Sequence, residues 1–203
     1  MATVLAIETS ADVCSVALEV DGAVFLSEHD EPRAHARVLL PAVETLLARA
    51  GIGVGQLDGI VYGRGPGSFT GLRIGCAVVQ GLAWPGDLPT LGVSSLAVLA
   101  AAARRAAAAE TAPVLALLDA RMDEFYLGAY GGGSPRDGLV ADRILARGDL
   151  DGTVTELLAG DPGPWLLTGD GVAALAERLP ESAASIVAAR PDAASLLALA
   201  AAG

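Results

Sequence analysis

The sequence contains no lysine and no asparagine, so its thirteen basic residues are all arginine. Twenty-four aspartates and glutamates outnumber them, and the formal net charge at pH 7 is −11. Since nucleic-acid affinity depends largely on Lys and Arg side chains that neutralise phosphates, we do not expect this chain to bind tRNA or DNA unaided. Four arginines of the N-terminal half could still form a local basic patch, and scattered solvent-exposed side chains are the alternative: Arg33, Arg37, Arg64 and Arg73.

Cysteine is also scarce. Cys14 and Cys76 are too few and too far apart for a disulfide or CxxC metal framework, and two free thiols are typical of a reducing compartment. Charged residues at 104, 105 and 110 interrupt the Ala-rich stretch before it reaches the ~20 apolar residues that span a bilayer. The N-terminus lacks the basic segment and cleavage site of a secretory signal. We therefore expect a cytoplasmic protein without a membrane anchor.

The common motifs of catalysis are missing. A P-loop requires a lysine, and Ser68 and Thr70 stand where the two candidate dinucleotide-binding fingerprints need their last glycine. Pro66 and Thr70 exclude a GxSxG nucleophile elbow. His29 and His35 form neither HxxxH nor HExxH, and we interpret both as surface residues. The sequence predicts no catalytic residue, metal or cofactor.

The first half of the chain alternates strands and helices. Apolar alternation and an Asp21-Gly22 turn predict three strands joined by hairpins, over residues 3–7, 13–20 and 23–28. Helical periodicity follows from residue 33 to Gly51, and then come a strand, a glycine-dense loop, a second helix, a strand and a third helix. These elements are expected at 58–62, 63–71, 70–84, 89–93 and from Ser94 or Ser95 to 109.

The apolar pattern of the second half is similar to that of the first, since residues 114–117 resemble 4–7 and residues 125–129 resemble 14–18. A strand near 164–168 and helices near 171–179 and 192–202 follow. We therefore expect an α/β protein with two related lobes, residues 1–110 and 111–203, each a mixed sheet flanked by helices. The alternative is that the two similar patterns arise by coincidence, because both belong to buried hairpins.

Two lobes that each open with a hairpin resemble the actin-like (ribonuclease H-like) ATPases, whose hairpin loops hold phosphate. Residues 8–12 offer a carboxylate and two hydroxyls for one such loop, although an ordinary tight turn explains them equally well. Residues 119–124 contain no glycine, serine or threonine, so the second loop suits a triphosphate poorly. We expect weak ATP binding or none.

The helix at 70–84 is apolar on nearly every side, with Arg73 and Gln80 as its strong polar residues. Such a helix must be covered all round, either inside its own lobe or by another protein. Gly71 and Gly75, one turn apart, would permit close approach of a second helix.

Three segments, residues 5–10, 62–75 and 119–124, resemble the TsaB (YeaZ) family, and the resemblance extends along the whole chain in order. It implies the actin-like, ribonuclease H-like fold and a noncatalytic role beside TsaD, a relative that carries the metal-binding histidines and the nucleotide site. TsaD, with the ATPase TsaE completing the complex, moves threonylcarbamoyl onto adenosine 37 of tRNAs that read codons beginning with A. The chain would meet tRNA only through TsaD.

The resemblance also implies that the first two helices join their counterparts in TsaD, or in a homodimer of the isolated chain. Carried onto this sequence, it nominates Leu39, Leu40, Val43, Leu46, Leu47, Leu72, Cys76, Val79, Gln80 and Ala83. Such relatives usually continue beyond the end of this sequence. The alternatives are a stand-alone ATP-dependent kinase or carbamoyltransferase and, less favoured without a histidine pair, a metallopeptidase.

Overall fold

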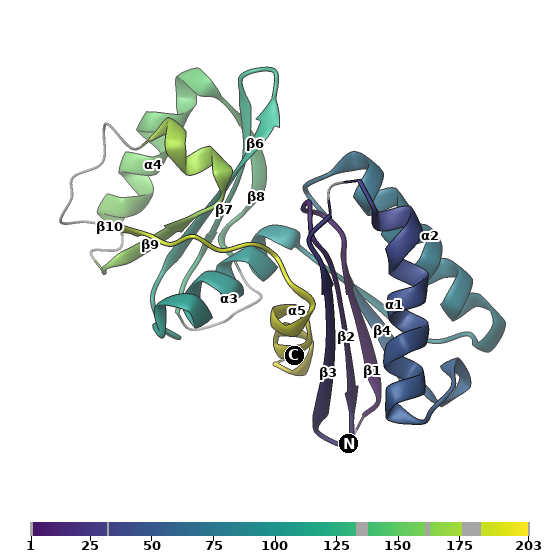
Figure 1. The fold of residues 1–203 in the computed structure, drawn as a ribbon. Coiled ribbons are helices and arrows are strands. Elements are labelled where there is room, and N and C mark those ends of the chain that lie inside the picture. Colours follow the sequence, from purple (N-terminus) through teal and green to yellow (C-terminus); the bar gives the residue numbers. More distant parts are fainter. Residues whose placement is uncertain (1, 32, 133–137, 161–162, 176–183, 203) are drawn as a thin grey trace. The chain divides into compact units, whose positions relative to one another are not determined.

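A computed structural model describes residues 2–31, 33–132, 138–160, 163–175 and 184–202. The chain forms two compact units, Met1–Val98 with Pro191–Gly203 and Leu99–Arg190. Each unit contains a five-stranded mixed sheet flanked by helices, which confirms the predicted α/β class with two related lobes (Figure 1). Within these described ranges, no helix is both long and apolar enough to cross a membrane.

The sheet of the first unit has the strand order β3-β2-β1-β4-β5. β1 lies at its centre, antiparallel to β2 and parallel to β4, and the apolar side chains of residues 5–7 are buried completely or nearly so. Asp21 and Gly22 both have positive φ, as the predicted hairpin turn between β2 and β3 requires. The strands are β1 Val4–Glu8, β2 Cys14–Val20, β3 Ala23–His29, β4 Gly59–Gly63 and β5 Thr90–Val93.

Helices cover both faces of this sheet (Figure 1). The helices α1 (His35–Ala50) and α2 (Phe69–Ala83) pack on one face, and α5 (Ala193–Ala201) contacts β1, β2 and β4 from the other. Short 3-10 turns, η1 (Val54–Gln56) and η2 (Trp84–Gly86), follow α1 and α2.

The expected division after residue 110 assigns the last helix to the second unit, whereas in the structure this helix belongs to the first unit. Asp192 caps α5 by accepting a hydrogen bond from the Ser195 N–H at 2.8 Å, and the Ala193 N–H donates to Ser15 Oγ of β2 at 2.9 Å. Leucines 196, 197 and 199 are buried. Burial of this apolar helix against the first sheet returns the end of the chain to the first unit.

The second sheet repeats the topology of the first. Its order, β8-β7-β6-β9-β10, has three antiparallel strands followed by two parallel ones, as in β3-β2-β1-β4-β5. This correspondence supports the repeat seen in the sequence. The strands are β6 Val114–Arg121, β7 Glu124–Tyr130, β8 Gly138–Ala146, β9 Trp165–Thr168 and β10 Ala184–Ile186.

The remaining helices are α3 (Ser95–Ala107) and α4 (Arg147–Gly160). The boundary between the two units in the sequence falls inside α3, between Val98 and Leu99. Of the helix expected at 171–179, the first part belongs to a short 3-10 helix, η3 (Asp170–Ala174), and residues 176–179 lie outside the described ranges. Ser94 rather than Ser95 caps α3, since its hydroxyl accepts from the Leu96 and Ala97 N–H groups.

Arg104 is a buried cation in the second unit, with 4 % of its surface exposed. Its guanidinium donates to three backbone carbonyls, those of Ala112 at 2.9 Å, Tyr130 at 2.9 Å and Gly131 at 2.7 Å. Burial lowers the pKa of Arg104, and the charge of Glu110 partly restores it. The side chain therefore ties α3 to the start of β6 and the end of β7.

We predict that Arg104→Met lowers the free energy of unfolding by about 2–4 kcal/mol, because it leaves three carbonyls without their charged donor. Urea unfolding followed by circular dichroism measures the change. Arg105→Met, at an exposed neighbouring position, should cost about 1 kcal/mol or less. Equal losses in the two variants would contradict a structural role for Arg104.

Candidate functional site

Two segments that are far apart in sequence lie against each other in the first unit. One is the acid loop, defined as Glu8, Thr9 and Ser10 at the end of β1, and all three residues are buried. The other is the glycine seam, defined as Gly63, Gly67, Gly71 and Gly75, which runs from the end of β4 through the loop into α2. At every seam position a Cβ atom would overlap an atom of the acid loop.

Glu8 places a carboxylate in the interior of the unit. Its Oε1 accepts a hydrogen bond from the Ser10 N–H at 2.7 Å, and its Oε2 accepts one from the Ser95 hydroxyl at 3.4 Å. The carboxylate occupies the space where a side chain at Gly63 would lie. Burial raises the pKa of Glu8, and the hydrogen bonds from residues 10 and 95 oppose that shift in part.

The other three seam glycines admit the backbone and side chains of the acid loop. A Cβ at Gly67 would overlap the Ser10 carbonyl, and Cβ atoms at Gly71 and Gly75 would overlap the Thr9 carbonyl and hydroxyl. The Ser68 N–H donates to the Ser10 carbonyl at 2.7 Å. Helix α2 therefore begins in direct contact with the acid loop.

This contact corrects the expected role of Gly71 and Gly75, which make room for Thr9 rather than for a neighbouring helix. The acid loop was not predicted to be their partner. The signal was present as a glycine at every fourth position from 63 to 75. This four-residue spacing runs from a loop into a helix, so neither the helical nor the strand pattern of apolar residues reveals it.

The corresponding turn of the second unit, between β6 and β7, is built differently. Arg121, Met122 and Asp123 all have positive φ, and the Arg121 N–H donates to the Asp119 carboxylate at 2.8 Å. Left-handed conformations at three non-glycine residues in succession are costly. This turn therefore places bulky side chains where a phosphate-binding loop would have glycines, as the sequence predicts.

The ten residues nominated for a partner divide by exposure. Gln80 and Leu40 are exposed, and Leu40 shows 43 % of its surface, whereas Leu72 and Cys76 are half-buried. The other six belong to the core that α1 and α2 share with the sheet: Leu39, Val43, Leu46, Leu47, Val79 and Ala83. Their side chains pack between the two helices and the sheet.

Exposed aromatic residues lie at both ends of helix α2, and neither was among the residues nominated for a partner. Phe69 is 68 % exposed and Trp84, directly after the helix, is 88 % exposed. The Arg73 guanidinium lies 3.8 Å from the centroid of the Phe69 ring. Within the described chain, nothing therefore covers the face of α2 that carries these side chains.

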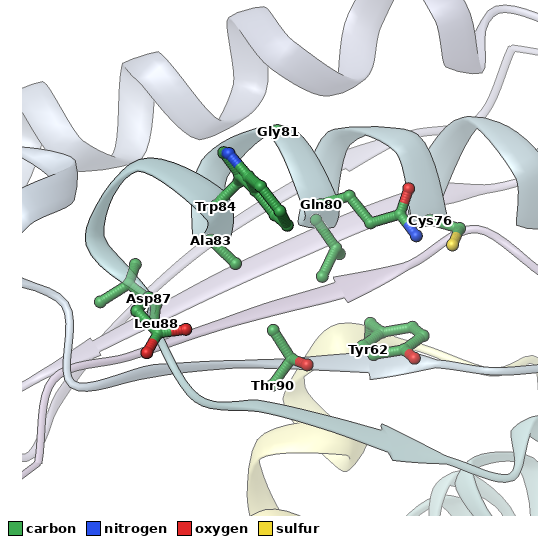
Figure 2. Close-up of a pocket in the computed structure, with 10 residues that line it drawn as sticks. Tyr62, Cys76, Gln80, Gly81, Ala83, Trp84, Asp87, Leu88 and Thr90 are labelled. Atoms are coloured by element: carbon green, nitrogen blue, oxygen red, sulfur yellow. The ribbon is translucent and has the colours of Figure 1, made fainter.

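A pocket of about 680 Å³ opens beside the second half of α2 (Figure 2). Its walls come from α2, the turn after it, and strands β4 and β5, and four nominated residues line it, namely Cys76, Val79, Gln80 and Ala83. The remaining lining residues are Tyr62, Gly81, Trp84, Asp87, Leu88 and Thr90.

The histidine and cysteine assignments need one correction. His35 is 5 % exposed at the start of α1, so its interpretation as a surface residue is wrong, since it lies on the buried side of that helix with Val38 and Leu39. Cys14 is a buried free thiol, and burial raises its pKa to about 11. In the described part of the chain, no group of three or more His, Cys, Asp or Glu residues could hold a metal ion.

We predict that Glu8→Gln increases the stability of the protein, increasingly so as the pH rises above 4.5. A carboxyl group with a raised pKa in the folded state binds protons more tightly there than in the unfolded chain, so its ionisation disfavours folding. Glutamine removes this penalty. Urea unfolding between pH 4 and pH 8 measures the difference, which Glu44→Gln on the exposed face of α1 should not show. A gap that narrows with increasing pH would refute the assignment.

Comparison with known proteins gives relatives over most of the chain. A family model described as TsaD: tRNA N6-adenosine threonylcarbamoyltransferase matches residues 29–196. The chain is 44 % identical over 124 residues to the tRNA threonylcarbamoyladenosine biosynthesis protein TsaB of Haemophilus influenzae, covering 61 % of this chain and 52 % of that protein. It is 46 % identical over 129 residues to TsaB of Escherichia coli, covering 63 % and 54 %. The chain thus spans about half the length of these relatives.

The solved structure of YeaZ from Pseudomonas aeruginosa is similar over 99 % of this chain and 91 % of that one. The TM-score is 0.84 and the sequence identity 38 %. The match includes both units, and hence both sheets and the acid loop. This structure, together with the TsaB relatives, shows that the chain belongs to the TsaB (YeaZ) family.

Proposed function

We propose that the chain is a noncatalytic subunit that associates with TsaD and supports transfer of threonylcarbamoyl to adenosine 37 of tRNAs reading codons that begin with A. The names of its relatives motivate the pathway. The observation that carries the noncatalytic role is the packing of the acid loop under the glycine seam. The protein would act in the cytoplasm, with TsaE joining the complex.

The acid loop has little capacity for a phosphate group. A nucleotide phosphate needs free backbone N–H donors and an unobstructed approach. Here the Ser10 N–H is already bonded to the Glu8 carboxylate, and the seam lies directly over Thr9 and Ser10. The Glu8 carboxylate, whenever it is ionised, would also repel a phosphate. A stand-alone kinase or carbamoyltransferase, the alternative, would need a phosphate in this place.

The exposed sides of α1 and α2 form the proposed docking face for TsaD. Leu40 on α1 and Phe69 at the start of α2 expose apolar surface, while the buried leucines beneath hold the helices on the sheet. Burial of such side chains is the main source of free energy in association. With a net charge of −11, the chain would reach tRNA only through TsaD.

We predict that Leu40→Glu weakens association with TsaD by about tenfold or more, because it places a charge in the centre of an apolar contact. Size-exclusion chromatography and calorimetric titration with purified TsaD measure the effect. Leu26→Glu is the matched control, since Leu26 on β3 is 42 % exposed against 43 % for Leu40. Alternation places Leu26 on the opposite face of the strand from Phe25, whose ring lies near Arg49 of α1. Equal affinity of the Leu40 variant and the unmodified chain would contradict the proposed face.

Variants at the buried positions would not test this proposal. Val79 is 3 % exposed and packs in the core of the first unit. A glutamate there would bury an unpaired charge and unfold the protein. Loss of association would then report loss of folding.

A further inference from the structure

The pocket beside α2 combines two aromatic side chains with one carboxylate. Of the described residues that line it, Asp87 alone is charged, and Trp84 and Tyr62 contribute their rings from opposite walls (Figure 2). The Gln80 amide and the Thr90 hydroxyl add neutral hydrogen-bonding groups. Aromatic faces together with a carboxylate are the surroundings that an organic cation prefers.

One short turn joins Asp87 to Trp84, and both residues line the pocket. Asp87 has a φ of 50°, and its N–H lies 3.5 Å from the Trp84 carbonyl, which it approaches across η2. No described side chain forms a hydrogen bond or an ion pair with the Asp87 carboxylate. Trp84 is 88 % exposed and, within the described ranges, no guanidinium lies over its ring. Both groups are therefore available to a ligand.

The same chain already pairs arginine with aromatic rings. The Arg73 guanidinium lies 3.8 Å from the Phe69 ring centroid, and that of Arg49 lies 5.5 Å from the centroid of Phe25. Trp84 presents the stronger cation-binding ring without such a neighbour. A net charge of −11 adds a long-range field that attracts cations.

We propose that this pocket binds an arginine side chain presented by the partner protein. A planar guanidinium can stack on the Trp84 indole while its N–H groups donate to the Asp87 carboxylate, which a compact ammonium cannot do as well. The pocket continues the exposed side of α2, since Cys76 and Gln80 line it from that helix. This inference deepens the proposed function, because it names a side chain that a partner docked on α2 contributes.

The test uses the isolated full chain labelled with ¹⁵N, and N-acetyl-arginine amide as the probe. Trp84→Phe assigns the indole N–H signal of Trp84, and the buried Trp165 supplies a second indole signal as an internal reference. The arginine probe should shift the Trp84 signal saturably and leave that of Trp165 in place. N-acetyl-citrulline amide, its neutral isostere, should not produce a saturable shift.

Asp87→Asn should weaken binding of the arginine probe by about three- to fivefold, the range expected for one exposed charge pair. Asp21→Asn is the matched control, because Asp21 is also an exposed aspartate with a positive φ, of 51°, and lies in the β2–β3 turn. It should leave the affinity unchanged.

Three results would overturn the inference: no saturable shift of the Trp84 signal, equal binding of the citrulline and arginine probes, or equal affinities of the two aspartate variants. Equal binding of citrulline would instead identify a slot for neutral groups. None of these results depends on TsaD, so the association test at Leu40 can succeed or fail separately.

Discussion

The close packing of the acid loop against the glycine seam is the contact on which the rest of the first unit depends. Four positions without side chains let α2 begin directly against the end of β1. The Glu8 carboxylate, rather than solvent or a ligand, fills the space above Gly63. Because α2 is held so near the sheet, its inner face is buried and its outer face stays exposed with aromatic residues at both ends.

The two units show how one topology can serve different purposes. Both sheets have the same sequence of antiparallel and parallel pairings around a central strand. Their first hairpins differ at the tip, since the first unit buries three small or acidic residues under glycines while the second exposes a turn with Met122, 92 % exposed. Topology alone therefore leaves the chemistry of each loop undetermined.

Most of the elements could be predicted because local signals agree with the final fold. Asp21 and Gly22 fixed a hairpin, and apolar alternation or short apolar runs identified the five strands of the first sheet. Strands β8 and β10 of the second sheet were not predicted. Helix α4 was missed because only Leu150 and Val154 are buried along it and two glycines interrupt its pattern. The place of α5 could not be read from sequence either, since an apolar helix fits any open sheet face.

The candidate site was predicted less completely for a similar reason. A helix that is apolar on nearly every side does not reveal which side meets the sheet, so buried Val79 and exposed Gln80 were nominated together. Trp84 was counted among the apolar residues of the predicted helix and Phe69 among those of the loop before it, but neither was predicted to be exposed. Gly71 and Gly75 indicated close approach correctly, but their partner, Thr9, lies more than sixty residues away in sequence.

Calorimetric titration of the isolated chain with Mg-ATP tests the central contact most directly. If the acid loop and the glycine seam exclude phosphate from the end of β1, the titration should give no saturable heat. Sub-micromolar binding accompanied by ATP turnover would contradict this account and favour a stand-alone enzyme.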